Sequence, residues 1–231
     1  MTKIYVYARY IKQGFLSPIE AFIRYLPGPV GNLLRYNFYK RKLKYLGKNV
    51  TINEGVYILN PEHISVGENT WIDKNVILAA GKPQKGERKF FWKNNKNYNG
   101  QIGELQIGKG CHIAPNAIIQ AHGGVEIGDY AGVASSGKIY SMSAHYRNLE
   151  TENGVLYKFT PRAPQNEQYL IIGPIVMEDN TGLGLNSVIL PGVTIGKNSW
   201  VGINSYVRNN IPPNSIAFGN PAKIVKKHRI N

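Results

Sequence analysis

Aliphatic residues recur at every sixth position along much of this chain, with polar residues and glycines between them. The longest uninterrupted run has its periodic positions at Met177, Leu183, Ile189, Ile195, Val201 and Val207. An α-helix repeats about every 3.6 residues and a β-strand about every 2, so neither element alone explains this period. A fixed spacing of this kind indicates a repeat architecture, in which each unit buries its apolar residue against its neighbours.

Two earlier stretches carry the same period, and a glycine often follows the periodic residue. The stretches are Val66, Ile72 and Leu78, and then Ile107, Ile113 and Ile119, continuing after a two-residue offset as Ile127, Val133 and Ile139; the glycines are Gly67, Gly108, Gly128, Gly184, Gly196 and Gly202. Six residues of about 3.3 Å make a side of roughly 20 Å, and three sides close a triangular coil. The stretches GENT, GKGC, GDYA, MEDN and GKNS supply Gly, Asn and Asp for its corners.

The pattern therefore predicts an all-β fold, a parallel β-helix of hexapeptide repeats. A sandwich of ordinary short strands would instead show turns about every 8–12 residues and strict alternation. Residues 81–102 and 141–170 interrupt the period. Because repeat folds accept insertions at their corners, where they often form a binding face, we expect both segments to be inserted loops. The expected β-helix domain covers residues 49–227, followed by a short tail at 228–231.

The N-terminal region, residues 1–48, has a different pattern. The sequence SPIE reads as a capping box with Ser17 at the N-cap, Pro18 at N1 and Glu20 at N3, and the helix should end at the PGP of residues 27–29. A second helix is expected over about residues 31–46, ending at Gly47. Two interpretations stay open: the helices cover the open end of the β-helix, or residues 1–46 contact an anionic membrane, because aromatic and basic residues are interleaved there.

Charge and cysteine content narrow the class of protein. The net charge of +14 indicates anionic partners, but no nucleic-acid-binding motif accompanies the basic residues, so no nucleic acid is expected. The single cysteine, Cys111, excludes an internal disulfide. No apolar run reaches the roughly 18 residues of a membrane-spanning helix, and no signal peptide is recognised. We expect a cytoplasmic protein, with peripheral contact at the inner face of the membrane as an addition.

Among the five histidines, His145 is the strongest candidate for chemistry. It follows a repeat strand and opens the second insertion, so a rigid edge would hold the imidazole while a loop folds over it. Imidazole is the side chain best suited to general-base work at neutral pH. His63 and His228 are interpreted as structural or solvated, and Cys111 has no visible group to activate its thiol.

The three hexad stretches, the histidine before a long loop and the ending NNIPPNSIAFGNPAKIVKK resemble the hexapeptide-repeat acyltransferases over residues 50–227. Within them, the chain is similar to the galactoside/maltose acetyltransferase-like sugar O-acetyltransferases of polysaccharide biosynthesis. The resemblance implies a left-handed β-helix that assembles as a homotrimer, with acetyl-CoA as co-substrate in a cleft between neighbouring subunits. It also implies that His145 deprotonates a sugar hydroxyl, which attacks the thioester directly without an acyl-enzyme.

The resemblance assigns further positions to the two substrates. Backbone groups at Gly184–Leu185 and Gly202–Ile203 would meet the pantetheine arm, Lys223 and Lys226 the nucleotide, with Arg208 as a further candidate; Gln120, His122, Tyr146 and Arg147 are the candidates for contact with the acceptor. Many relatives carry a Trp–Ile–Gly run after the loop. This chain has Gly182 at the aromatic position, so that contact is either absent or supplied elsewhere. The sequence assigns no group that orients His145.

Several functions stay open at this point. The favoured one is an acetyl-CoA-dependent O-acetyltransferase acting on a sugar or glycan, such as a precursor of a polysaccharide, O-antigen or capsule. N-acetylation of an amino sugar needs the same base and coenzyme site, so the sequence does not separate the two. A zinc hydro-lyase resembling γ-class carbonic anhydrases needs three converging histidines, and the spacing of His112, His122 and His145 does not fit, so no metal is expected. A non-catalytic scaffold would require neither the basic terminus nor the long loop behind one histidine.

Overall fold

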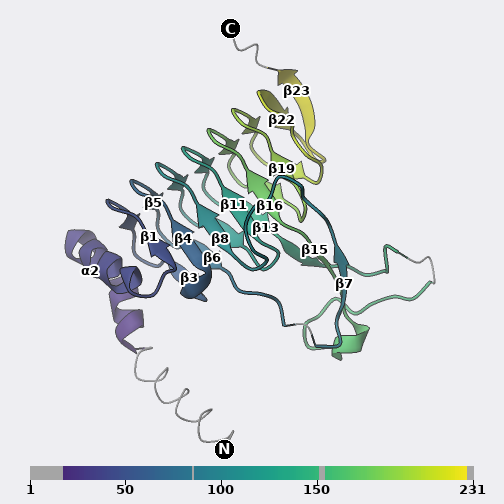
Figure 1. Ribbon diagram of the computed structural model, residues 1–231, viewed down its shortest axis with the longest axis horizontal. Coiled ribbons are helices and arrows are strands. Elements are labelled where there is room, and N and C mark those ends of the chain that lie inside the picture. Colours follow the sequence, from purple (N-terminus) through teal and green to yellow (C-terminus); the bar gives the residue numbers. More distant parts are fainter. Residues whose placement is uncertain (1–17, 85, 151–153, 228–231) are drawn as a thin grey trace, which may run out of the picture.

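The computed structural model describes residues 18–84, 86–150 and 154–227, and most of them form a three-sided prism of parallel strands (Figure 1). Sheet A contains β1 (Tyr45–Leu46), β4 (Ile64–Val66), β8 (Leu105–Ile107), β11 (Val125–Ile127), β16 (Ile175–Met177) and β19 (Thr194–Ile195). Sheet B contains β2 (Thr51–Ile52), β5 (Trp71–Ile72), β9 (His112–Ile113), β12 (Gly132–Val133), β17 (Gly182–Leu183), β20 (Trp200–Val201), β22 (Ser215–Phe218) and β23 (Lys223–Lys227). Sheet C contains β3 (Tyr57–Leu59), β6 (Ile77–Ala79), β10 (Ile118–Gln120), β13 (Lys138–Tyr140), β18 (Val188–Ile189) and β21 (Tyr206–Val207).

The chain visits sheets A, B and C in turn, and each strand pairs in parallel with the equivalent strand of the next coil. Among the described strands of these three sheets, β23 alone departs from this arrangement, because it runs antiparallel to β22 at the end of sheet B. The expected parallel β-helix of hexapeptide repeats is therefore confirmed. A fourth sheet of three strands, β14 (Met142–Ala144), β15 (Tyr169–Ile172) and β7 (Lys89–Trp92), lies beside the prism. The short 3₁₀-helices η1 (Pro61–His63) and η2 (Gln165–Glu167) lie between strands.

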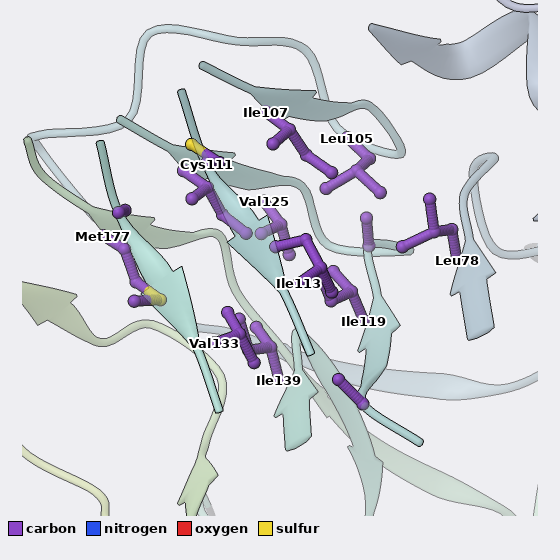
Figure 2. Close-up of a cluster of buried hydrophobic side chains, with 14 of the residues drawn as sticks. Leu78, Leu105, Ile107, Cys111, Ile113, Ile119, Val125, Val133, Ile139 and Met177 are labelled. Atoms are coloured by element: carbon purple, nitrogen blue, oxygen red, sulfur yellow. The ribbon is translucent and has the colours of Figure 1, made fainter. Parts of the chain in front are cut away.

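The hexad residues form the core, as the period predicts. Ile113 is in register with Ile72 on one side and with Val133 on the other, so equivalent residues stack from coil to coil. Figure 2 shows Ile113, Ile119, Val133 and Ile139 directed into the same interior space. Each of these side chains is at most 1% exposed. Burial of one aliphatic side chain per side is thus what fixes the six-residue spacing.

The corners of the prism use residues that tolerate a left-handed backbone. All five stretches predicted to turn contain a residue with positive φ; these are Asn69, Gly110, Tyr130, Asn180 and Asn198. Asparagines of successive coils also bond to one another, as where Asn186 Nδ2 donates to Asn204 Oδ1 at 2.9 Å. The glycine after the hexad residue has another cause. A Cβ on Gly184 would lie 2.7 Å from the carbonyl carbon of Gly202, so only glycine lets adjacent coils stack this closely.

Two helical segments cover the N-terminal end of the prism (Figure 1). The first is described over residues 18–25 and ends before residues 27–29, as predicted, whereas the expected N-cap Ser17 lies outside the described residues. The second, α2 (Gly28–Lys40), begins earlier and ends earlier than the predicted 31–46. That prediction was wrong because Leu46 pairs with Val66 and extends sheet A, which overrides the helical pattern of this stretch.

A buried arginine attaches these helices to the prism. Arg35 has no exposed surface, and its guanidinium donates to the backbone carbonyls of Ile52 at 2.7 Å, Leu26 at 2.6 Å and Ile23 at 2.9 Å. Desolvation lowers the pKa of Arg35. Ile23 belongs to the first helical segment, Leu26 to the turn after it and Ile52 to strand β2, so Arg35 ties the cover to the first coil. No helix in residues 18–84, 86–150 and 154–227 is long and apolar enough to cross a membrane.

Candidate active site

The two insertions meet and form one small sheet beside the prism. Both leave it at the corner after sheet C, following β6 and β13, and both return to sheet A. β14 pairs antiparallel with β15, and β15 pairs in parallel with β7, so that Tyr169 lies opposite Lys89. Figure 1 shows β7 and β15 side by side at the edge of the prism. Two segments that are remote in the sequence therefore build a single platform.

His145 directly follows β14, and its ring is held on several sides. Its backbone N–H donates to the carbonyl of Tyr169 at 2.9 Å, which continues the pairing of the two strands. The imidazole stacks on Tyr146, with ring centroids 4.9 Å apart, and meets Tyr169 edge-on at 6.4 Å. These contacts fix the plane of the ring at the end of a rigid strand.

The backbone of Arg147 determines which imidazole nitrogen carries the proton. His145 Nδ1 lies 2.8 Å from the carbonyl oxygen of Arg147 and 3.3 Å from its backbone nitrogen. The shorter contact requires Nδ1–H to donate to the carbonyl, since two acceptors cannot bond to each other. The proton of neutral His145 is therefore assigned to Nδ1, and Nε2 has a lone pair that can accept a proton. The orienting group that the sequence leaves unassigned is this carbonyl.

The acceptor candidates Tyr146 and Arg147 lie beside His145. Tyr146 is exposed, and the guanidinium of Arg147 lies 5.5 Å from the centre of its ring. The carbonyl of Tyr146 accepts a hydrogen bond from Tyr157 N–H at 2.7 Å, and Arg147 forms a bridge with Leu156. Both side chains therefore border the exposed surface around the imidazole.

The other two acceptor candidates, Gln120 and His122, lie elsewhere. Gln120 Oε1 accepts the backbone N–H of Met142 at 3.0 Å, so this amide fixes the start of β14. His122 lines a hollow together with Met142 and Leu170. Leu170 and its neighbour Tyr169 point to opposite faces of β15, because side chains alternate along a strand. His122 and His145 are therefore on opposite faces of the small sheet.

The coenzyme candidates Leu185 and Ile203 stack at the corner between sheets B and C. They follow Gly184 and Gly202 in successive coils, and both side chains are exposed. The carbonyl of Leu185 accepts the N–H of Asn204 at 2.9 Å, so it is used within the prism. The backbone N–H groups of these two residues donate to no backbone carbonyl within the described ranges. A ladder of such N–H groups suits the amide carbonyls of pantetheine.

The basic candidates divide between two corners. Lys223 begins β23 opposite Phe218, which ends β22 and packs against Gly202. Lys223 thus lies at the same corner as Ile203, beyond the last coil. Lys226 lies opposite Ile216 on β23, which is exposed along its length. Arg208 follows β21 and lies at the other corner, between sheets C and A. The structure therefore places Lys223 along the line of Leu185 and Ile203, Lys226 beside the Trp200 column of sheet B, and Arg208 at another corner.

A tryptophan from the next coil covers the glycine at the expected aromatic position. Gly182 is in register with Trp200, and a Cβ on Gly182 would lie 2.6 Å from the indole ring. Together with Gly132 and His112, these residues border a hollow of about 310 Å³ on sheet B. An aromatic ring therefore does cover this position, and it comes from Trp200. The run Trp200–Val201–Gly202, one coil after Gly182, is the sequence signal that reveals it.

The two halves of the candidate site lie at opposite edges of sheet C. His145 belongs to the insertion at the corner after this sheet, whereas Leu185 and Ile203 lie at the corner before it. One side of six residues is up to roughly 20 Å wide. Within one chain, the base and the coenzyme corner are therefore separated by the width of a sheet.

The remaining reactive side chains have structural surroundings. Cys111 is buried, its thiol contacts the carbonyl oxygen of Gly128 at 3.1 Å, and burial raises its pKa to about 11. His112 stacks on Trp71 at 4.9 Å, and its Nε2 lies 3.5 Å from Asp73 Oδ2. His228 lies outside the described residues. No group of three or more His, Cys, Asp or Glu side chains within the described ranges could hold a metal ion.

Residues 174–208 match the family model described as the hexapeptide repeat of succinyl-transferase. Galactoside O-acetyltransferase of Escherichia coli is 29% identical over 167 residues, which are 71% of this chain and 63% of that protein. A Staphylococcus aureus protein with an acetyltransferase name is 49% identical over 63 residues, 27% of this chain and 32% of that protein. The chain thus carries the hexapeptide repeat and is similar to sugar acyltransferases along much of its length. The matched part spans about a third to two thirds of these two relatives.

Further relatives include a sugar acyltransferase and two proteins of known structure. The dTDP-4-amino-4,6-dideoxy-D-glucose acyltransferase of Escherichia coli is 25% identical over 184 residues, 80% of this chain and 82% of that protein. AntD, an N-acyltransferase from Bacillus cereus solved with dTDP and coenzyme A, superposes with a TM-score of 0.66 and 25% identity over 84% of this chain and 88% of its own. A hexapeptide-repeat acetyltransferase from Vibrio cholerae shares the fold, with a TM-score of 0.51 and 21% identity over 93% of this chain and 89% of its own.

Proposed function

We propose that this chain transfers an acyl group from acyl-CoA to a sugar, with acetyl-CoA as the donor and a hydroxyl as the acceptor. The observation that carries the proposal is the hydrogen bond from His145 Nδ1 to the carbonyl of Arg147, which leaves Nε2 as the proton acceptor. The stacked Tyr146 ring holds this imidazole at the end of β14. A general base must be oriented in this way before a substrate binds.

The described site offers one proton acceptor and no activated nucleophile. These two features favour direct attack by the acceptor over a covalent intermediate. His145 Nε2 takes the proton of a sugar hydroxyl as its oxygen attacks the thioester carbonyl of the donor. The bond from carbon to sulfur then breaks, and the imidazolium returns its proton to the leaving thiolate. No acyl-enzyme is needed, and the buried, protonated Cys111 is unsuited to form one.

The donor is expected along the corner of Leu185, Ile203 and Lys223. Its amides would accept from the backbone N–H groups of Leu185 and Ile203, and its phosphates would lie near Lys223 and Lys226. The coenzyme A complex of AntD supports this class of donor. The hollow beside Trp200 lies on the same side of the prism and provides further apolar surface.

We place the complete site between two copies of the chain, in a homotrimer. His145 and the donor corner lie at opposite edges of sheet C, so one chain holds them a sheet width apart. A neighbouring copy that brings its donor corner to the platform would join the two halves. A cyclic assembly with such head-to-tail contacts repeats the same site at each interface.

The named relatives support both oxygen and nitrogen acceptors. Galactoside O-acetyltransferase favours a hydroxyl, whereas the amino-sugar acyltransferase and AntD favour an amine. We propose the hydroxyl, because a neutral His145 with a lone pair on Nε2 is needed most where the attacking group must lose its proton early. N-acylation of an amino sugar is the alternative.

The test is release of coenzyme A from acetyl-CoA over a panel of sugars, amino sugars and their nucleotide-linked and lipid-linked forms. His145→Ala should lower kcat by about 10²–10⁴-fold while leaving donor binding unchanged. His63→Ala is the matched control, since that histidine ends the 3₁₀-helix η1 and belongs to neither insertion. Turnover by His145→Ala equal to wild type would refute the base. A wild type that neither binds acetyl-CoA in calorimetry nor turns over would leave the scaffold interpretation.

We further propose that the N-terminal helices contact an anionic membrane surface. Their outward face exposes large apolar side chains, including Phe22 at 66% and Leu33 at 62%, with the others being Ile19, Tyr25, Val30 and Leu34. The buried residues Gly31, Arg35 and Tyr39 mark the opposite face of α2, so the exposed apolar side chains do not pack against the prism. The exposed cations Lys40, Arg41 and Lys48 lie at the end of α2 and just after it, at the same end of the prism. Apolar side chains bordered by cations suit an anionic lipid surface.

Flotation with vesicles of anionic and of neutral lipid tests this contact. Wild type should float with anionic vesicles, and Phe22→Ser/Leu33→Ser should not. Leu156→Ser/Phe159→Ser is the control, because it removes two equally exposed apolar side chains from the insertion. Equal flotation of both double variants would refute the surface. Loss of dimer or trimer mass in Phe22→Ser/Leu33→Ser, without any lipid binding by wild type, would assign the face to protein association instead.

A further inference from the structure

A hollow of about 380 Å³ lies between the two insertions, on the face of the small sheet opposite His145. Its apolar floor comes from β14 and β15, and its polar side chains come from the loop before β7 and from the end of the second insertion. The lining residues are Asn60, Lys82, Pro83, Gln84, Arg88, His122, Met142, Pro161, Gln168 and Leu170. The hollow exists only because the insertions pair, and the proton transfer at His145 involves none of its lining residues.

A buried amide holds one cation at the edge of this hollow. Gln168 is 5% exposed, and its Oε1 accepts Arg88 Nε at 2.9 Å. Its Nε2 donates to the carbonyl of Ala163 at 2.6 Å, which fixes the orientation of the amide. Arg88 Nη1 makes only a long contact of 3.4 Å to the carbonyl of Gln84. The guanidinium is therefore positioned through Nε, and most of its donors face away from that bond.

The hollow carries positive charge without a carboxylate. No acidic side chain lines it, and neither Lys82 nor Arg88 forms an ion pair within the described ranges. His122 Nδ1 lies 2.8 Å from the carbonyl of Gly81, so that nitrogen donates and Nε2 is the other ring nitrogen available to a ligand. A concave surface with cations of one sign concentrates anions.

We propose that this hollow binds a phosphate or diphosphate group of the acceptor, so that the acceptor is a phosphate-linked sugar rather than a free one. The inference rests on the proposed acyl transfer to a sugar. A guanidinium held at Nε presents a donor fork that matches phosphate oxygens, and Lys82 adds a second charge. The apolar floor of Met142 and Leu170 suits the group on the far side of the phosphate, whether a nucleoside or an isoprenoid chain.

The position of the hollow relative to His145 agrees with an anchoring role. Met142 lines the hollow at the start of β14, and His145 follows the end of the same strand. Three residues of about 3.3 Å separate them by roughly 10 Å. Because β14 is an edge strand of the small sheet, an acceptor anchored by its phosphate would pass around this edge and present its sugar, and not the phosphate, near the base.

Calorimetry without acyl-CoA tests the site directly, with inorganic pyrophosphate, UDP and farnesyl diphosphate as probes. Wild type should bind pyrophosphate, and Lys82→Gln/Arg88→Gln should weaken binding at least about tenfold. Arg41→Gln/Lys48→Gln is the control, because it also removes one arginine and one lysine, both from exposed positions in the N-terminal region. Tighter binding of UDP than of pyrophosphate identifies a nucleotide-linked acceptor, and tighter binding of farnesyl diphosphate a lipid-linked one.

Two results would overturn the inference: no binding of pyrophosphate, or equal affinity in the hollow variant and the control. Its failure is separable from failure of the acyl transfer itself. His145-dependent transfer to a phosphate-free sugar that is unchanged in Lys82→Gln/Arg88→Gln would refute the anchor and leave the transferase standing. Pyrophosphate binding that is lost in this variant, without acyl transfer to any acceptor, would support the anchor and refute the transferase.

Discussion

Gly132 and Gly182 are neighbours on sheet B, and one added methyl group should affect them in opposite ways. They are in register with each other, and both side-chain positions face outward in the same column. A Cβ on Gly132 meets no atom within 4 Å, whereas a Cβ on Gly182 would lie 2.6 Å from the Trp200 ring. The pair therefore compares the same substitution with and without the tryptophan.

The expected difference follows from the area that Trp200 buries. Gly132→Ala should stabilise the fold by about 0.5–1 kcal/mol, because alanine loses less backbone entropy than glycine in a strand. Trp200 is 56% exposed, so 44% of its surface is buried. For a side chain of about 250 Å² this is roughly 110 Å², or about 2.7 kcal/mol at 25 cal/mol per Å² if the ring swings fully away. Gly182→Ala should thus be about 1–3 kcal/mol less stable than Gly132→Ala.

Urea unfolding followed by circular dichroism measures the two free energies of unfolding. In a Trp71→Phe/Trp92→Phe background, the emission of Trp200 should shift to longer wavelength in Gly182→Ala and stay unchanged in Gly132→Ala, because the displaced ring enters water. Equal stability of both variants, with unchanged emission, would refute the packing of Trp200 over Gly182.

Three further predictions concern the core, the N-terminal cover and the thiol. Ile189→Ala should cost about 2–5 kcal/mol in urea unfolding and its outward-facing neighbour Val188→Ala less than about 1, and equal costs would contradict the hexad core. Arg35→Met should cost at least about 3 kcal/mol because it leaves three carbonyls unpaired, against almost nothing for the exposed Arg41→Met; a small cost for both would refute the anchoring role. Burial raises the pKa of Cys111 from 9.0 to about 11, so the folded state holds this proton more tightly than the unfolded state, and the stability present below pH 9 falls as the pH rises to 11. Between pH 8 and pH 11, the free energy of unfolding of Cys111→Ala should fall by roughly 2–3 kcal/mol less than that of wild type. Equal falls in the two proteins would refute the effect.

The prism could be predicted from the sequence because its core follows one local rule. Each hexad residue packs against the residue at the equivalent position of the next coil, as with Ile113 and Val133. The six-residue period therefore also determines the strand register. Asparagines and glycines likewise mark the corners, because these residue types favour the left-handed backbone that the corners need. The placement of both insertions at corners follows from where the period stops.

The rest depends on contacts between remote segments. Nothing in Lys89–Trp92 indicates a strand that pairs with Tyr169–Ile172, and without that pairing neither the platform nor the hollow beneath it can be predicted. The early end of α2 has the same cause, because Leu46 joins sheet A only once β4 is present. The group that orients His145 is a backbone carbonyl, which every residue has, so no residue type marks it.

The most direct test of the composite acyl-transfer site mixes two inactive variants. His145→Ala removes the base, and Leu185→Glu/Ile203→Glu blocks the donor corner with exposed substitutions. If each site takes its base from one copy and its donor corner from the neighbour, refolding the two variants together at equal amounts should restore about a quarter of the wild-type release of coenzyme A. A mixture no more active than the separate variants, while refolded wild type regains full turnover, would contradict a site shared between copies.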